Sequence, residues 1–137
     1  MAGQEPDSKN QSLSRYTLLY PPSLNSNWRV YNGRILISKK YRAWQKQALK
    51  ALMIQGLSDP LMGAVAVELA VIPPDNRKRD IDNVSKPILD ILTRAAVWVD
   101  DSQVNKLTIT RKPMRIGGAV EITIYGQKEG TSKKESD

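Results

Sequence analysis

The chain has 137 residues, a formal net charge of +7, and neither cysteine nor histidine. Its length suits a single domain with one modest core, and its composition excludes a disulfide framework, a thiolate zinc site and the commonest general base, histidine. Any bound metal would have oxygen ligands, which favours Mg²⁺ or Mn²⁺.

Both ends of the chain are polar and show no hydrophobic periodicity. Residues 1–14 are predicted to be a disordered leader and residues 127–137 a disordered charged tail, on either side of one domain over residues 15–126. The leader lacks the apolar centre of a signal peptide, and no apolar run approaches the roughly 18 residues of a membrane span. We therefore expect a cytoplasmic protein with no membrane partner.

The N-terminal part is predicted to form two strands, at residues 15–20 and 35–37. The segment between them is a long loop or loose hairpin that holds two arginines and two aromatic residues: Arg29, Arg34, Trp28 and Tyr31. These side chains could contact a DNA backbone or stack on an unpaired base. Alternatively, the aromatic rings simply cover the edge of the core.

Residues 39–55 are predicted to form an amphipathic helix, with Ser38 as its N-cap and Gly56 after its last turn. One face is an apolar stripe that belongs to the core: Tyr41, Trp44, Ala48, Leu49 and Leu52. The other face is a row of cations: Lys39, Arg42, Lys46 and Lys50. The row is either a solvated surface or a contact with a phosphate backbone.

Residues 64–72 are almost continuously apolar, which predicts a central strand buried on both faces. A loop over residues 75–82 follows, and then a helix from about residue 83 to residue 94. Pro87 conflicts with a regular helix there, because proline lacks an N–H and clashes with the preceding turn. Either the helix starts at Ser85 or its first turn is distorted.

Residues 105–111 and 119–125 are predicted to be the last two strands. The whole order is then β-β-α-β-α-β-β. This order indicates an α+β domain in which two helices pack on one mixed sheet.

The acids of this basic chain are concentrated in one part of it. Six aspartates lie between residues 75 and 101: Asp75, Asp80, Asp82, Asp90, Asp100 and Asp101. A basic run, Arg77-Lys78-Arg79, adjoins the first of them. The surplus of positive charge indicates a polyanionic partner, most simply nucleic acid, although many small domains are basic for no such reason.

This pattern can be interpreted as a metal site beside a phosphate site. In an extended segment Asp80 and Asp82 project to the same side and could reach one cation. The pair Asp100-Asp101 could join them only if the chain turns sharply after the second helix. Mg²⁺ would shield a phosphate and activate water, and Lys86 could stabilise charge on a leaving oxygen.

Each acid also has a purely structural interpretation. Asp82 could cap the second helix, and Asp90 could pair with Lys86 one turn away. Asp100 and Asp101 could simply form a turn. These interpretations leave unexplained why acids adjoin the basic run.

The stretch PDNRKRDIDNVSKPILDILTRAAVWVDDSQV (residues 74–104) resembles the signature of the RusA family of Holliday junction resolvases. That signature is a proline-aspartate, a basic run, DxDNxxK, a helix and a Trp-x-Asp-Asp-x-Gln turn. The upstream PPSLNSNWRVYNGRILIS is similar to the family's opening, and the resemblance covers about residues 16–125.

The resemblance implies a homodimeric, Mg²⁺-dependent endonuclease that resolves four-way DNA junctions by paired nicks, with Mn²⁺ as a substitute and no organic cofactor. The family's essential aspartates fall on Asp80, Asp82 and Asp101, and its essential lysine on Lys86, while Asp100 matches an acid of second rank. A phage or prophage origin would fit. A two-fold dimer would present two identical sites to the junction.

DNA contacts are expected from the basic residues of the loops and the first helix: Arg29, Arg34, Lys46, Arg77, Lys78 and Arg79. Two other functions remain open at this point. The chain could be a non-catalytic module that binds junctions or other DNA. It could also be a metal-dependent nuclease that acts on other branched DNA, on RNA or on nucleotides.

Overall fold

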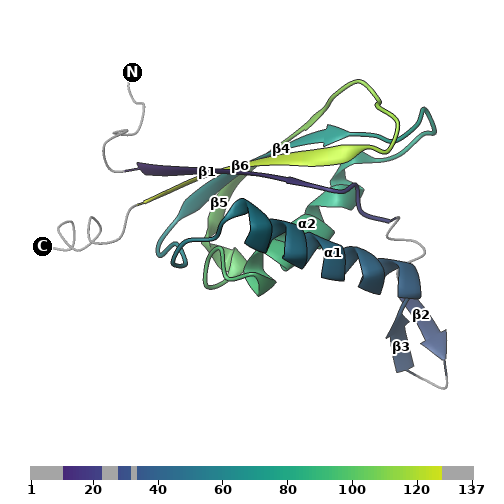
Figure 1. Cartoon of the computed structure of the whole chain (residues 1–137), viewed down its shortest axis with the longest axis horizontal. Helices are drawn as coiled ribbons and strands as arrows, with labels where there is room; N and C mark the ends of the chain where they lie inside the picture. Colours follow the sequence, from purple (N-terminus) through teal and green to yellow (C-terminus); the bar gives the residue numbers. More distant parts are fainter. Residues whose placement is uncertain (1–10, 23–27, 32–33, 128–137) are drawn as a thin grey trace, which may run out of the picture.

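The computed structural model describes residues 11–22, 28–31 and 34–127, with side chains over 12–22 and 38–126. A four-stranded sheet forms one layer and two helices form the other (Figure 1). The strands lie in the order β1 (Gln11–Leu18), β6 (Ala119–Gln127), β4 (Val65–Ile72) and β5 (Val104–Arg111). Only β4 and β5 are parallel neighbours, so the sheet is mixed and the predicted α+β class is confirmed.

The helices are α1 (Lys39–Gln55) and α2 (Ser85–Arg94), with two short 3₁₀ turns, η3 (Ile81–Val84) and η4 (Asp101–Gln103). A separate hairpin of β2 (Trp28–Tyr31) and β3 (Arg34–Ile37) lies beside the start of α1 (Figure 1). The predicted order of elements is confirmed, and the predicted loose hairpin adds one strand to it.

Helix α1 begins and ends where the sequence predicts. The Ser38 hydroxyl accepts a hydrogen bond from the Tyr41 N–H at 3.1 Å, and Gly56 follows the last turn with a φ of 102°. Four residues of the predicted stripe are buried: Tyr41, Trp44, Ala48 and Leu52. The fifth, Leu49, is only partly buried at the margin of the stripe. At the other end of the helix, the Gln55 amide bonds both the N–H and the C=O of Thr17, which fixes α1 against β1.

Strand β4 is central, as predicted, but it is buried on one face only. Val67 and Leu69 are 1% exposed, whereas Glu68 between them is exposed. Both helices cover the same face of the sheet, so the other face is open (Figure 1). The prediction of burial on both faces was wrong because the outward residues Ala66 and Ala70 are small and apolar without being buried.

Strand β1 begins earlier than predicted. It pairs with β6 along its whole length, from Gln11 opposite Gln127 to Leu18 opposite Val120. Residues 11–14 therefore belong to the sheet and not to a disordered leader, and Gln127 belongs to β6 and not to the tail. The rest of the predicted leader and tail lies outside the described residues. Within the described part of the chain, no helix is long and apolar enough to cross a membrane.

Candidate active site

The two acid clusters lie at opposite ends of the domain. The loop with Asp80 and Asp82 follows β4, whereas Asp101 precedes β5. Because β4 and β5 are parallel, with Val65 opposite Val104 and Val71 opposite Arg111, the clusters are separated by the length of the strands, about 23 Å at 3.3 Å per residue. The expected convergence within one chain is not found, and no three acidic side chains gather among the described residues.

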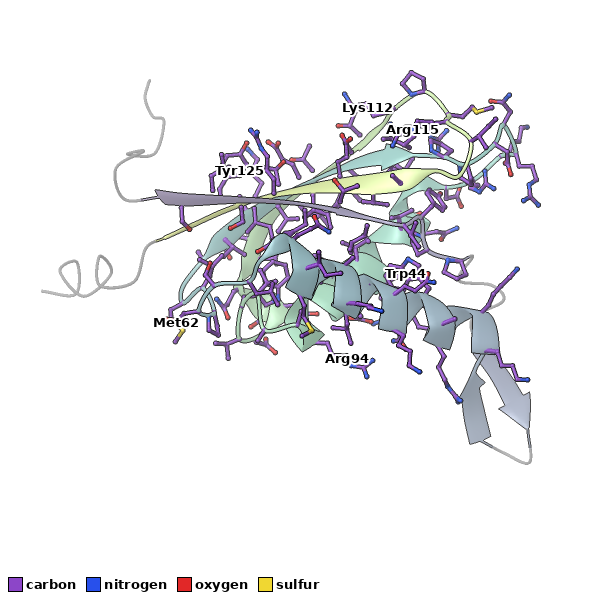
Figure 2. All side chains as sticks on the ribbon, viewed as in Figure 1. Trp44, Met62, Arg94, Lys112, Arg115 and Tyr125 are labelled. Atoms are coloured by element: carbon purple, nitrogen blue, oxygen red, sulfur yellow. The ribbon has the colours of Figure 1, made fainter. Side chains whose placement is uncertain are left out.

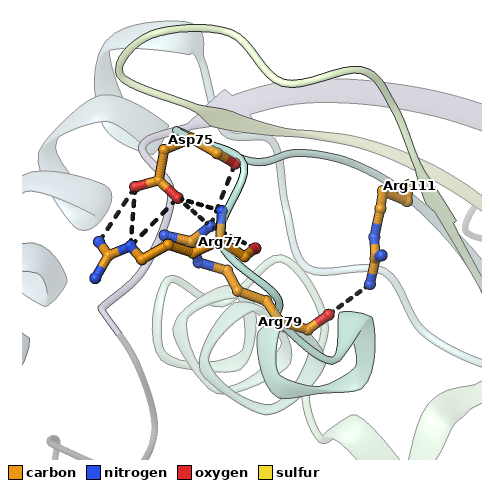
Figure 3. A network of polar contacts seen from close by, with 4 residues as sticks. All are labelled: Asp75, Arg77, Arg79 and Arg111. Atoms are coloured by element: carbon orange, nitrogen blue, oxygen red, sulfur yellow. Dashed lines mark hydrogen bonds and ion pairs between the residues drawn. The ribbon is translucent and has the colours of Figure 1, made fainter.

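Asp75 organises the loop after β4 (Figure 3). Its carboxylate accepts a 2.7 Å hydrogen bond from Arg79 Nη1 and a 3.1 Å bond from Arg77 Nη2, and also bonds the Arg77 N–H at 3.0 Å. These contacts, those of Arg79 first, hold the pKa of Asp75 far below its usual range. Two of the three cations in the basic run, Arg77 and Arg79, are therefore already paired with a carboxylate of their own loop.

Arg79 and Arg77 differ in exposure. The Arg79 side chain is 22% exposed, lies 5.6 Å from the centre of the Tyr20 ring, and has its pKa raised by the bond to Asp75. Its carbonyl accepts a 2.6 Å hydrogen bond from Arg111. Arg77 is 79% exposed, and Lys78 is exposed as well. Arg79 thus fixes the loop, and Arg77 and Lys78 are the cations that face solvent.

Asp80 and Asp82 are both exposed, and neither carboxylate makes a hydrogen bond or ion pair with another described residue. Asp80 is extended at the start of η3, but Asp82 lies inside this 3₁₀ turn. The sequence argument from strand alternation therefore does not apply to the pair. The alternative role of Asp82 as a helix cap is not found either, since Val84 occupies the N-cap position of α2.

Helix α2 starts at Ser85, which resolves the conflict that Pro87 posed. Pro87 lies in the first turn, where its missing N–H would have no partner within the helix, and the turn before it is 3₁₀. Lys86 forms the ion pair with Asp90 that the structural interpretation of these residues predicted. Its ammonium group donates to Asp90 at 3.2 Å, and with a side chain 64% exposed it remains accessible.

At the opposite end, Asp100 and Gln103 form a capping box around η4. The Asp100 carboxylate accepts from the Ser102 N–H at 2.9 Å, and Ser102 lowers the pKa of Asp100. The Gln103 side chain accepts from Val99 and Asp100 and donates to the carbonyls of Leu61 and Gly63. Sequence reasoning included Gln103 in the family signature but gave it no structural role, although the Asp-x-x-Gln spacing is a capping-box signal.

Asp101, by contrast, is exposed, and its carboxylate makes no hydrogen bond or ion pair within the described residues. Each end of the domain therefore carries one acid used to hold the chain, Asp75 or Asp100, next to acids that are free to bind a ligand. The free acids are Asp80, Asp82 and Asp101, the three that the family resemblance selects.

A groove of about 1090 Å³ runs between the first half of α1 and the loop after β4. Lys40 and Gln47 line it from α1, and Arg77, Lys78 and Asp80 line it from the loop. Lys46 is exposed on another face of α1 and does not line the groove. The DNA contact predicted for Lys46 stays a prediction. Sequence reasoning did not single out Lys40, although the spacing of residues 40, 43, 44 and 47 defines one helix face.

The side chains of Arg29 and Arg34 lie outside the described residues. A smaller pocket of about 260 Å³ lies on the far side of Arg79, where Arg111, Lys112 and Met114 line it. The cations around both hollows belong to one end of the domain. Figure 2 shows Lys112 and Arg115 at this end and Met62 at the other.

Comparison with known proteins relates the chain to nucleases. A family model described as "Endodeoxyribonuclease RusA" matches residues 19–125. The chain is 35% identical over 108 residues to the crossover junction endodeoxyribonuclease RusA of Shigella sonnei (strain Ss046), which covers 79% of this chain and 90% of that relative. With the same coverage, identity is 34% to the protein of that name from Escherichia coli (strain K12) and 35% to that from Enterobacteria phage 82.

Proposed function

The chain belongs to the RusA family of endodeoxyribonucleases, and we propose that it is a Mg²⁺-dependent enzyme that resolves four-way DNA junctions by paired nicks. One observation carries this proposal. In each acid cluster the aspartates at the family's essential positions are the exposed, unpaired ones among the described residues, whereas their neighbours Asp75 and Asp100 are hydrogen-bonded. Carboxylates left unpaired in a basic protein are suited to bind a cation.

The carboxylates of Asp80 and Asp82 fit the role of hard oxygen ligands. Mg²⁺ is usually held by one or two carboxylates and keeps several waters, and Mn²⁺ accepts similar ligands. When bound, the metal would shield the phosphate and lower the pKa of the water that attacks phosphorus. Side chains of the protein would hold the DNA in position for this reaction.

Those side chains bind and orient the DNA backbone. Arg77 and Lys78 are exposed beside Asp80 and would contact phosphates on either side of the cleaved bond. Lys86 would exchange its exposed partner Asp90 for the oxygen on which charge develops. Arg79 would not touch DNA, because its role is to hold the loop in place.

We further propose that two copies share each site. Asp101 is too far from Asp80 to act with it in one chain, but a two-fold axis that sets unlike ends of two copies side by side would bring the partner subunit's Asp101 to the loop. Strand β5 suits such an arrangement. It lies at the edge of the four-stranded sheet and, among the described strands, pairs only with β4.

Substitution of Asp82 tests the proposed function. Asp82→Asn should slow Mg²⁺-dependent nicking of a synthetic four-way junction by on the order of 1,000-fold. Binding, measured by gel shift, should stay equal or become tighter because one negative charge near phosphate is removed. Glu121→Gln, an exposed acid on the open face of the sheet, is the matched control and should cut at the parent rate.

Cleavage by Asp82→Asn at the parent rate would contradict the site assignment. A parent protein that binds junctions but cuts no DNA with Mg²⁺ or Mn²⁺ would instead be a binding module. Parallel assays on duplex, flap and RNA substrates test the remaining alternative. We place the activity in the cytoplasm of a bacterial cell, where junction DNA occurs, whether the chain is encoded by a host or by a phage.

A further inference from the structure

The groove beside Asp80 is large enough to hold a nucleotide. Its volume of about 1090 Å³ is at or slightly above the upper end of small-ligand pockets, which measure roughly 300–1,000 Å³, and the groove is open to solvent. One wall is the first half of α1 with residues 19–22, which follow β1, and the other is the segment from Pro74 to Val84. Asp80 lies in the second wall, so a ligand in the groove is adjacent to the proposed metal site.

The lining of the groove combines three kinds of group. Cations contribute from both walls, with Lys40 on α1 and Lys78 on the loop. The apolar part includes Pro21 and Ala43, which offer flat or small surfaces. A duplex backbone would use the cations but would leave the apolar part without a partner.

Two amides complete the lining. Gln47 on α1 and Asn83 on the loop face the groove from opposite walls. Neither side-chain amide makes a hydrogen bond with another described residue, although Asn83 is half-buried. Each amide presents a donor and an acceptor, which is the pattern that binds the edge of a nucleobase.

We propose that this groove binds an unstacked nucleotide of the cleaved strand, next to the phosphate that is cut at the metal site proposed for Asp80 and Asp82. The phosphates would contact Lys40 and Lys78, and the base would lie against the apolar surface with its edge bonded to Gln47 and Asn83. This inference rests on the proposed nuclease function. It also gives a reason for junction selectivity, since unstacking a base costs least where strands exchange and duplex stacking is already interrupted.

A fluorescent base reports directly on this unstacking. Junctions with 2-aminopurine at single positions, placed in turn on each side of the branch point, are bound to the protein carrying Asp82→Asn, which prevents cutting. We expect a several-fold rise in fluorescence at one position, because unstacking removes quenching by neighbouring bases. Ala43→Phe, which fills the groove, and Gln47→Leu, which removes one amide, should each abolish most of that rise.

The same two substitutions are tested for cleavage in the protein with Asp82 intact. Each should slow junction cleavage by about 10- to 100-fold, as expected for a misplaced phosphate, with binding reduced far less. Met53→Phe is the matched control, because Met53 is 68% exposed on the same helix and does not line the groove. Circular dichroism establishes that Ala43→Phe is folded, and Gln47→Leu tests the groove without added bulk.

The inference is overturned if no position brightens in the parent complex, or if Ala43→Phe and Gln47→Leu behave like Met53→Phe while the parent cuts junctions. In that case the proposed nuclease function stands without the groove. A parent that binds junctions but does not cut them contradicts the proposed function instead, and the fluorescence experiment, which requires binding alone, still decides about the groove.

Discussion

The loop after β4 and the turn before β5 each place one hydrogen-bonded aspartate beside exposed ones, but their surroundings differ. Around Asp75 the partners are two arginines, and the adjoining groove is lined by further cations. Around Asp100 the partners are the Ser102 backbone and the neutral side chain of Gln103. The first end can attract a phosphate backbone, and the second has no cation in its network.

Exposed apolar side chains occur at both ends and do not distinguish them. Leu61 and Trp98 form a parallel bridge, so the residues that follow them, Met62 and Val99, are neighbours beside Asp100. Their side chains are 52% and 59% exposed. At the first end, Met114 and Ile116 in the turn after β5 are 41% and 88% exposed. The difference in charge remains, and it fits a division of labour in which one end binds the substrate and the other contributes Asp101 to a neighbouring subunit.

Mixing two inactive variants gives the largest effect and tests this division directly. If sites are shared between subunits, a dimer of one Asp82→Asn chain and one Asp101→Asn chain has one intact site, made from the unaltered residue of each chain. Random mixing then restores about a quarter of the parent nicking sites, because half the dimers are mixed and each has one good site. The measurement is nicking of a labelled junction after the two inactive proteins are mixed.

The outcome separates shared sites from separate ones. If each site is built within one chain, every site in the mixture carries one of the two substitutions and stays inactive. A mixture as inactive as its components would therefore contradict the proposal that subunits share sites. Paired cleavage should not recover in the mixture, since each mixed dimer has only one active site. A mixture of Asp82→Asn with Asp80→Asn is the control, because both changes fall in the same half of the site and no combination repairs it.

Removing Gln103 should have the next largest effect, on stability at the second end. Gln103→Ala deletes four hydrogen bonds that join the loop at Leu61 and Gly63 to the turn before η4. We expect the free energy of unfolding to fall by about 2 kcal/mol in urea titrations. Gln47→Ala, which removes an amide with no hydrogen bond to another described residue, should change it by less than about 0.5 kcal/mol.

The local signals in the sequence predicted the elements well. Helix α1 follows from Ser38, the apolar stripe and Gly56, since each acts over one or two helical turns. The start of β1 was missed because an edge strand over Gln11–Ser14 can be polar and still pair with β6. What the local signals did not contain is the layer arrangement, which leaves one face of the sheet open although β4 is apolar.

Local sequence signals predicted even less about how the site residues are arranged in space. Spacing could identify Asp80, Asp82 and Asp101 as a set by resemblance, but it could not place them, because the parallel pairing of β4 and β5 is a long-range feature. Nor could it tell that Arg79 would be paired with Asp75 and packed on Tyr20, while Arg77 next to it stays exposed. Partners from distant segments decide which charges are free.

Substituting Asp75 sharpens the comparison at the first end. Asp75→Asn keeps an acceptor but removes the charge that holds Arg77 and Arg79. We expect junction binding to be undiminished, since a negative charge is lost, and the cleavage rate to fall by roughly 3- to 10-fold because the loop that carries Asp80 is less fixed. The exposed loop residue Asp59, substituted to Asn, is the control for loss of an acid outside this network.

The pH dependence of the same variant checks the cause. The pKa of Asp75 is lowered in the folded protein, so its ionised form stabilises the fold above the unfolded pKa of about 3.9, and this contribution is lost as the pH falls toward the folded value. The urea midpoints of parent and Asp75→Asn should therefore differ near pH 7 and converge as the pH falls below about 4. A difference that persists unchanged in acid would mean that the ion pairs are not its source.

The smallest effect is expected at Asp100, and it is informative because Asp101 is its neighbour. Asn accepts the Ser102 N–H at an N-cap about as well as Asp does, so Asp100→Asn should leave the urea midpoint within error and cleavage within about 2-fold of the parent. Asp100→Ala loses the cap and should lower the midpoint. Asp101→Asn should abolish cleavage with no loss of stability. If Asp100→Asn were instead as inactive as Asp101→Asn, Asp100 would act on substrate or metal, and the division of each cluster into a structural and a free acid would fail at this end.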